Sequence, residues 1–215
     1  MKGERLKVEE LLIRLKKHYP DVKKTALHFS NPIEILVATI LSAQCTDERV
    51  NKITPQLFRK YKNTADYANT GIKEFEQEIR STGFYHNKAR NIIGMAKIIE
   101  KKYNGKVPNT MAELLTLPGV ARKTANIVLS NAFGIIDGIA VDTHVKRLSS
   151  RLGLSKNEQP EKIEQDLMNI VSQKDWFAIS NLLIEHGRKI CKAQKPDCKN
   201  CFLLDICPKI NVTGN

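Results

Sequence analysis

The sequence of 215 residues lacks any uninterrupted apolar run approaching the roughly 20 residues that a membrane-spanning helix needs. It contains one tryptophan, and it shows no internal repeat, low-complexity segment or flexible linker. Its first residues, MKGERLKVEELLIRLKKHY, carry too much charge for a secretory signal peptide. We therefore expect a cytoplasmic protein with no membrane association.

Acidic residues are also scarce relative to basic ones. The 35 Lys and Arg residues exceed the 23 Asp and Glu residues and give a formal net charge of +12. This balance favours a polyanionic partner, with nucleic acid as the first candidate. A merely soluble, lysine-rich chain has the same composition, so the charge needs a site to support it.

Apolar spacing predicts helices throughout the chain. Val8, Leu11, Leu12 and Leu15 follow the rhythm of one amphipathic face that ends before Pro20. Asn31 and Pro32 form an N-cap pair ahead of IEILVATILSA, whose nearly continuous apolar character predicts a buried central helix. Further helices are expected near residues 47–61, 71–81, 86–103, 110–116, 121–133, 143–152, 160–172 and 175–189. Only GIIDGIAV at 134–141 resembles a strand, so the fold class is all-α.

The stretch LPGVARKTA, residues 117–125, predicts a tight turn between two helices, the first of which begins with a Thr110 and Glu113 capping pattern. Pro118 presets the turn, and Gly119 permits positive φ. Unpaired amides at the start of the second helix are suited to bind a phosphate. The two helices and their turn therefore predict a motif that binds the DNA backbone independently of base sequence. An ordinary helical hairpin remains the alternative.

Lys123 lies in the first turn of that second helix, where the helix dipole disfavours a cation. A solvated or phosphate-pairing lysine is one interpretation. The other is an amine nucleophile, which needs a lowered pKa because at about 10.4 only about one amine in a few thousand is neutral at pH 7. Burial, the helix start and neighbouring Arg122 all act in that direction.

A carboxylate, Asp142, follows nineteen residues after Lys123, in IAVDTHVKRL. Its position before a helix predicts an N-cap, and that role is compatible with facing Lys123 and stabilising positive charge at a sugar C1′. His144 in the same turn is expected to be structural or to contact a phosphate.

Four of the five cysteines, Cys191, Cys198, Cys201 and Cys207, have six, two and five residues between them, and Pro208 follows the last. Zinc is the alternative metal, but the two CxxC pairs of a zinc site usually stand about 12 to 20 residues apart. Compact four-cysteine runs that end in CysPro favour a [4Fe-4S] cluster. Cys45 is expected to be a small buried residue.

LPGVARKTAN, VDTH and the cysteine loop, in this order, resemble the endonuclease III family of base-excision DNA glycosylases. The likeness includes LSAQCTDERVN at 41–51 and TGFYHNKARNI at 82–92, and so covers nearly the whole chain. It implies a helix-hairpin-helix DNA glycosylase fold, with a six-helix domain at 25–135. A [4Fe-4S] cluster domain would then combine 1–24 with 136–215.

The resemblance also implies functional roles. Lys123 would be the catalytic amine of a glycosylase and apurinic/apyrimidinic (AP) lyase that acts on damaged pyrimidines or abasic sites in double-stranded DNA, with Asp142 as its essential partner. Gln44 would fill the space left by a flipped nucleotide, and Phe84 is the candidate wedge. The remaining expected DNA contacts are Leu117, Gly119, Val120, Ala121, Arg122 and His144.

Other readings remain open at this point. The sequence disfavours the adenine-specific mismatch glycosylases of the same superfamily. Those enzymes lack a lysine at the position of Lys123 and depend on a glutamate before the glutamine motif, whereas VATILSAQ at 37–44 of this chain contains no carboxylate. Close lyase relatives that excise mismatched thymine or uracil, or oxidised guanine, share these motifs. A non-catalytic DNA-binding or redox-sensing protein is the alternative of a different class. We expect a monomer that is associated with the nucleoid if the source is prokaryotic.

Overall fold

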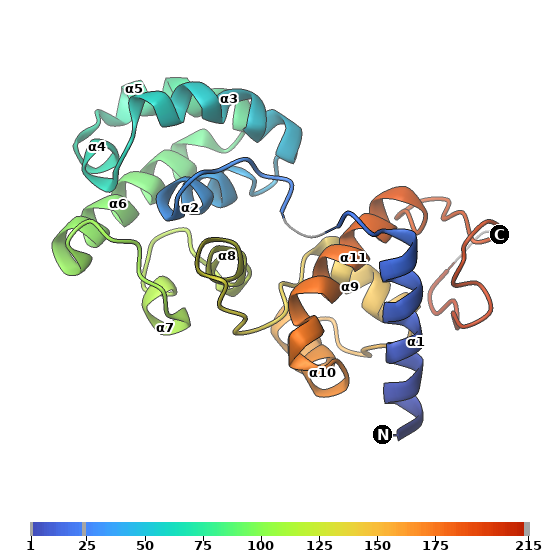
Figure 1. Ribbon diagram of the computed structural model, residues 1–215. Helices are drawn as coiled ribbons and strands as arrows, with labels where there is room; N and C mark the ends of the chain where they lie inside the picture. The colour runs from blue at the N-terminus through green and yellow to red at the C-terminus, as the bar shows by residue number, and fades with distance from the viewer. Residues whose placement is uncertain (1, 23–24, 213–215) are drawn as a thin grey trace. The chain divides into compact units, whose positions relative to one another are not determined.

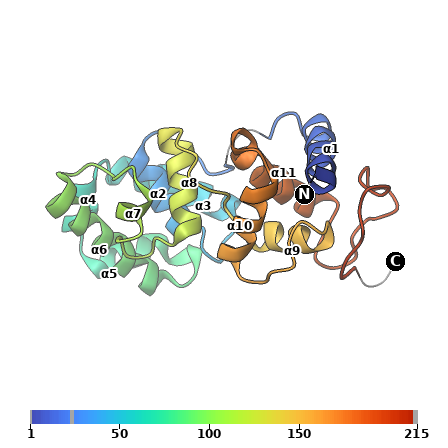
Figure 2. The same cartoon turned by 90° about the horizontal axis from the view of Figure 1, so that it is seen from below.

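The computed structural model describes residues 2–22 and 25–212. This part of the chain contains helices and no strand, which confirms the predicted all-α class (Figures 1 and 2). The α-helices are α1 (Lys2–His18), α2 (Pro32–Leu41), α3 (Asp47–Lys60), α4 (Thr64–Asn69), α5 (Ile72–Ile79), α6 (Tyr85–Tyr103), α7 (Met111–Leu114), α8 (Arg122–Val128), α9 (Thr143–Arg151), α10 (Pro160–Ile170) and α11 (Trp176–Lys189). No helix of the described residues is long and apolar enough to cross a membrane.

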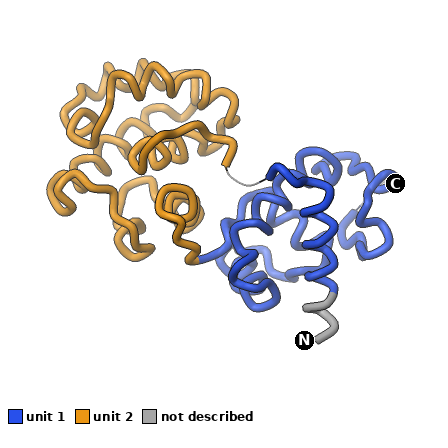
Figure 3. The backbone as a smooth tube through the Cα atoms, in the orientation of Figure 1, with its two compact units in different colours: residues 1–24, 138–215 blue, residues 25–137 orange. Residues whose placement is uncertain are grey.

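The chain divides into two compact units (Figure 3). Unit 2 is continuous in sequence and comprises residues 25–137, which include α2 to α8. Unit 1 combines residues 1–24 with residues 138–215, so α1 belongs to the same unit as α9, α10 and α11. Each unit has its own apolar core.

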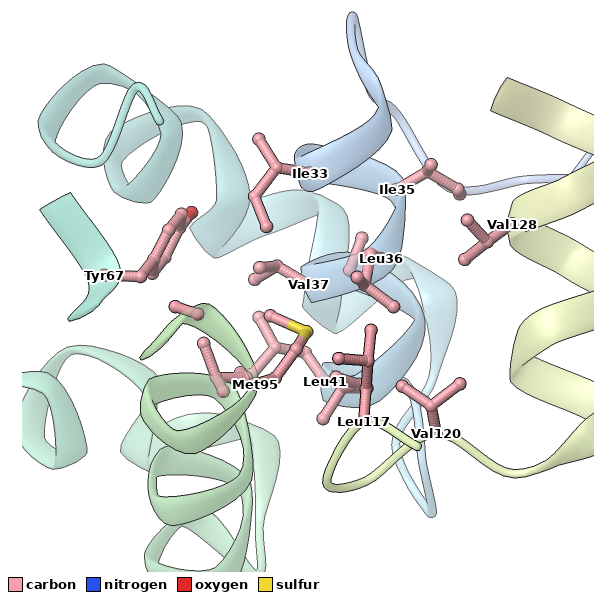
Figure 4. Close-up of a cluster of buried hydrophobic side chains, with 14 of the residues drawn as sticks. Ile33, Ile35, Leu36, Val37, Leu41, Tyr67, Met95, Leu117, Val120 and Val128 are labelled. Carbon is pink, nitrogen blue, oxygen red and sulfur yellow. The ribbon is translucent and has the colours of Figure 1, made fainter. Parts of the chain in front are cut away.

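Helix α2 is the centre of unit 2. Every residue from Ile33 to Leu41 is buried, as the apolar run in the sequence predicts. Figure 4 shows that side chains of this helix point in several directions, toward Met95 of α6 and toward Val128 of α8. A helix covered on several sides loses most of its apolar surface to the core, so α2 supplies a fixed frame for the segments at its ends.

Local signals fix where α2 and its neighbours begin. The predicted N-cap of α2 is confirmed, because the Asn31 side chain accepts a hydrogen bond from the Glu34 N–H at 3.0 Å. Thr110 caps α7 in the same way, accepting from the Glu113 N–H at 3.3 Å. Helix α4 was not predicted from the sequence, although Asn63 and Asp66 form a full capping box at its start.

The core of unit 1 joins the two ends of the chain. Val8, Leu11, Leu12 and Leu15 of α1 are buried, as their spacing predicts, together with apolar residues of α9, α10 and α11. Gly187 lies within α11, where a Cβ would come 2.9 Å from the Arg147 and His144 side chains. Because no side chain fills that space, α9 and α11 approach closely. Residues 134–141, the one run with a strand-like pattern, form no strand.

Candidate active site

The turn between α7 and α8 is built around a proline and a glycine. The Val120 N–H donates to the Leu117 carbonyl at 3.1 Å and closes a four-residue turn with Pro118 second and Gly119 third. Gly119 has φ +77°, the left-handed value that a type II turn requires at its third position. Leu117 and Val120 are buried in the core of unit 2, so the turn is anchored by their side chains.

Lys123 is the second residue of α8, and its side chain is exposed. Ala121 is the N-cap residue, and its side chain cannot satisfy the amides of the first turn. Within the described residues, the N–H groups of Gly119 and Ala121 donate no hydrogen bond. Backbone donors therefore surround the start of the helix on which the lysine is carried.

Helix α8 does not continue as a regular α-helix to residue 133, as the sequence pattern suggested. It ends at Val128 and passes into one π-helical segment, Leu129–Phe133. Such segments are rare and occur disproportionately at functional sites. Gly134, at φ +67°, terminates the segment.

Gln44 and Phe84 lie in two loops of unit 2. The Gln44 loop, residues 42–46, joins α2 to α3, and the Phe84 loop, residues 80–84, precedes α6. Gln44 has φ +53° and Phe84 has φ +49°, both unusual for residues other than glycine. Backbone held in such a conformation costs about 1–3 kcal/mol and is found preferentially at ligand-binding sites. Both side chains are exposed, and Phe84 retains 64% of its accessible surface.

Asp142 belongs to unit 1 and directly precedes α9. Its Oδ1 accepts a hydrogen bond from the Val145 N–H at 2.8 Å, which confirms the predicted N-cap. The side chain of His144, in the first turn of α9, lies with Nδ1 3.2 Å from Nη2 of Arg147. Burial lowers the pKa of His144, so the ring is neutral near pH 7. Lys123, by contrast, belongs to unit 2.

Two arginines of α9 hold the start of the cysteine loop. Arg147 donates to the Cys191 carbonyl at 3.0 Å and to the Gly187 carbonyl at 3.1 Å. Arg151 donates to the Lys192 carbonyl at 2.7 Å, and its Nη1 lies 3.4 Å from the Cys191 sulfur. These contacts fix the backbone where the loop leaves α11 and place positive charge beside the first cysteine.

A buried polar chain reaches a second cysteine. The Tyr19 hydroxyl of the segment after α1 lies 3.0 Å from Nδ1 of His186, and His186 Nε2 lies 3.6 Å from the Cys201 sulfur. Burial lowers the pKa of His186 to about 4 and raises that of Tyr19 to about 12. Both groups are therefore neutral at physiological pH, as a buried hydrogen-bonded pair requires.

The four clustered cysteines carry free thiols and are all partly exposed. The thiols of Cys191, Cys198 and Cys207 lie close enough to Cys201 to interact with it electrostatically, and burial is the main cause that raises the pKa of Cys201. No three side chains of His, Cys, Asp or Glu among the described residues converge on one point that suits a single metal ion. The groups available to bind a metal cluster in this loop are thus four neighbouring thiols, none of which forms a disulfide.

Comparison with known proteins defines the class. The superfamily of HhH-GPD base excision DNA repair proteins matches residues 37–173, and the chain belongs to this superfamily. Among similar proteins, "Endonuclease III" of Synechocystis sp. is 52% identical over 208 residues, which are 97% of this chain and 94% of that protein. The predicted endonuclease III family is thereby confirmed.

Solved structures agree with this assignment. A "non-covalent Endonuclease III-DNA Complex" superimposes with a TM-score of 0.91 at 45% identity, covering 95% of each chain. A "Trapped Endonuclease III-DNA Covalent Intermediate" gives the same TM-score and identity over 95% of this chain and 96% of that one. The helix-hairpin-helix glycosylase fold expected from the resemblance is therefore confirmed.

Some residues that shape these sites were not identified from the sequence. Arg147 and Arg151 were missed, although two arginines four residues apart on one helix face are a recognisable pattern for a shared partner. His186 and Lys88 were also missed, because nothing in the sequence marks which polar residues of a helix are buried.

Proposed function

We propose that this chain removes oxidised or otherwise damaged pyrimidines from duplex DNA and cuts the strand 3′ to the lesion, with Lys123 as the nucleophile. As a member of the endonuclease III family, it is a base-excision DNA glycosylase with lyase activity. The observation that supports Lys123 as the nucleophilic amine is its position in the structure. It is exposed in the first turn of α8, directly after a turn that offers unpaired amides.

The reaction follows from the chemistry of a primary amine. The neutral Lys123 amine attacks C1′, the glycosidic C–N bond breaks, and the base leaves with the bonding electrons and takes up a proton. Loss of the amine proton and opening of the sugar ring give a Schiff base at C1′. Removal of a C2′ proton then expels the 3′ phosphate, and water hydrolyses the imine to release the enzyme.

Asp142 is proposed as the carboxylate partner of Lys123. A carboxylate stabilises the positive charge that develops on the sugar when the base departs, and it accepts protons during elimination. Its N-cap bond to Val145 fixes the carboxyl group at the start of α9, which suits a catalytic group that must not reorient. His144, neutral near pH 7, is proposed as a hydrogen-bonding contact to the DNA backbone.

The turn between α7 and α8 is proposed to bind the DNA backbone. The free N–H groups of Gly119 and Ala121 are suited to phosphate oxygens, and Arg122 adds charge beside them. Leu117 and Val120 are buried, so their contribution is through the backbone of the turn. These contacts do not depend on sequence, as repair of a lesion in any context requires.

Gln44 and Phe84 are proposed to enter the duplex. Both are exposed at loop positions with left-handed backbone, where the side chain projects from a constrained turn. Gln44 would occupy the space of the flipped nucleotide, and the Phe84 ring would wedge beside the opposite strand. Flipping favours lesions whose pairing or stacking is already weak.

Cys191, Cys198, Cys201 and Cys207 are proposed to hold a [4Fe-4S] cluster. Four neighbouring thiols fit this group by the chemistry of the donor set, and each thiolate of such a cluster binds a different iron rather than one shared ion. When bound, the cluster would fix the loop after α11. We assign it a structural role in folding and DNA docking. We also propose that the protein acts in the cytoplasm, in association with the nucleoid if the source is prokaryotic.

The test is covalent trapping. Duplex DNA with one thymine glycol is incubated with the protein, and borohydride is added to reduce any Schiff base. The expected result is a protein–DNA adduct that Lys123→Ala abolishes, while Lys146→Ala, which removes another exposed lysine, retains it. Absence of an adduct on thymine glycol, uracil and abasic sites would refute the amine mechanism.

A further inference from the structure

Lys88 is a buried lysine whose position the proposed chemistry does not explain. It lies in the first turn of α6, four residues after Phe84, and retains only 4% of its accessible surface. A buried ammonium group is costly unless its protons are donated to acceptors. Burial accordingly lowers the pKa of Lys88.

Both partners of Lys88 are backbone carbonyls. The Nζ atom donates to the Leu41 carbonyl at 2.7 Å and to the Thr82 carbonyl at 2.8 Å. Within the described residues no carboxylate pairs with it. The amine is therefore not a member of an ion pair, and its role is to join two points of the main chain that are distant in sequence.

The two carbonyls stand at the starts of two loops. Leu41 is the last residue of α2, where the final carbonyls lack helical partners and the dipole favours a cation (Figure 4). Three residues later comes Gln44, with φ +53°. Thr82 ends the turn after α5, and Phe84, with φ +49°, follows two residues later.

No other described group donates to either carbonyl, and both residues are buried. Lys88 is thus the single link that satisfies the Leu41 and Thr82 carbonyls, and it does so with one rigidly held nitrogen. Loss of this nitrogen would leave two buried acceptors unpaired at the base of both loops. The hydrogen-bonded link between the Gln44 loop and the Phe84 loop would then be lost.

We propose that Lys88 is a positioning residue that couples the Gln44 loop to the Phe84 loop, so that the two side chains enter a duplex at a fixed spacing as one unit. The inference rests on the proposed function, because it assigns a purpose to the loops only if Gln44 and Phe84 contact DNA. Lys88 itself touches neither the reacting sugar nor the base.

The experiment compares Lys88→Met with Lys97→Met. Both changes remove one positive charge from α6, but Lys97 is exposed, so the control keeps the carbonyl link and matches the loss of charge. Single-turnover rates are measured for excision of thymine glycol from a duplex and for cleavage at a preformed abasic site in the same duplex. Only the first reaction must extrude a base.

For Lys88→Met we expect excision to fall at least about tenfold more than abasic-site cleavage, since a lost charged hydrogen bond commonly costs one to two orders of magnitude. Lys97→Met should leave the ratio of the two rates at the wild-type value. Equal loss of both rates in Lys88→Met, or a ratio equal to that of Lys97→Met, would overturn the proposal.

Amide hydrogen exchange provides a readout that does not depend on activity. In Lys88→Met, exchange in residues 42–46 and 80–84 should accelerate together, while the turn at 117–121 keeps its wild-type rate. Acceleration of all three segments would identify a general loss of stability and overturn the positioning role. If the wild type lacked both activities, the proposed function would fail, and the exchange result would still decide whether Lys88 couples the loops.

Lys88→Arg covers the case in which Lys88→Met does not fold. Arginine keeps the charge and can donate to two carbonyls, so we expect slow exchange in both loops and a ratio of rates within about threefold of wild type. Rapid exchange in both loops with an unchanged ratio of rates would show that the coupling is unnecessary and would overturn the proposal.

Discussion

The side chain of Asn91 fills the space beside Gly119, so that a Cβ added to Gly119 would lie 2.9 Å from the Cβ of Asn91. Gly119 also has φ +77°, which L side chains rarely adopt. The turn between α7 and α8 therefore depends on glycine for two separate reasons, its backbone conformation and its lack of volume.

Gly119→Ala should lower the free energy of unfolding by about 2–4 kcal/mol, combining left-handed strain with a clash in a packed region. Gly134→Ala is the matched control, because Gly134 has φ +67° but no atom within 4 Å of an added Cβ. Urea denaturation should show a cost of about 1–2 kcal/mol for the control. Equal costs for both variants would contradict the role of Asn91.

The two proposed roles of Asp142 can be separated by substitution. Asparagine caps a helix as well as aspartate does, so Asp142→Asn should keep the thermal midpoint while excision falls about a hundredfold or more. Asp142→Ala should lose the same activity and, in addition, about 1 kcal/mol of stability with the Val145 cap. Wild-type excision by Asp142→Asn in a single-turnover assay would remove Asp142 from the catalytic mechanism.

The cysteine loop makes a compositional prediction. The purified protein should contain about four iron atoms and about four inorganic sulfides per chain. Cys198→Ala should lose iron and lower the thermal midpoint, whereas Cys45→Ala, outside the loop, should retain the full complement. Metal analysis that found zinc without sulfide would contradict the proposal.

Much of this architecture is predictable because local signals coincide with tertiary ones. The Asn31 cap and the apolar run after it define α2, and the same residues form the core of unit 2. Asp142 was predicted as an N-cap for the same reason, since a cap depends on neighbours within three residues. Helix α4 was missed because six residues are too few to show an amphipathic period, and its capping box was the one available signal.

The link through Lys88 was not predictable by such reasoning. Its two acceptors lie 47 and 6 residues away, and both are main-chain atoms whose availability depends on how α2 and the turn after α5 end. The π-helical segment after α8 is equally hidden, because the sequence through residue 133 continues a helical pattern without interruption. Neither the Lys88 hydrogen bonds nor the π-helical segment is marked by a pattern of residue types in the sequence.

Tyr67 offers a test of the core. Its hydroxyl is buried and has no hydrogen-bond partner among the described residues, whereas the Tyr61 hydroxyl lies 3.0 Å from that of Thr70. Tyr67→Phe should leave stability unchanged or raise it by up to about 1–3 kcal/mol, and Tyr61→Phe should cost about 1 kcal/mol. Calorimetric unfolding at pH 7 measures the stability of both variants. A larger loss of stability in Tyr67→Phe than in Tyr61→Phe would contradict the prediction.

The same tyrosine predicts a dependence on pH. Burial raises the pKa of Tyr67 in the folded protein above its usual value of about 10, so the unfolded chain releases this proton first as the pH rises. The part of the free energy of unfolding that depends on protonation of Tyr67 is therefore fully present below pH 10 and declines as the pH rises above it. Unfolding free energies measured from pH 8 to pH 11 should decline less steeply for Tyr67→Phe than for wild type.

The pairing of α1 with the last third of the chain has a consequence for biosynthesis. The apolar face of α1 packs with residues 139–203, which the ribosome makes only after all of unit 2. At 5–20 residues per second this delay is on the order of 10 s, during which unit 2 can complete its own core. Throughout that interval the nascent α1 presents Val8, Leu11, Leu12 and Leu15 without their final partners, so the core of unit 1 forms only after the last third of the chain has been made.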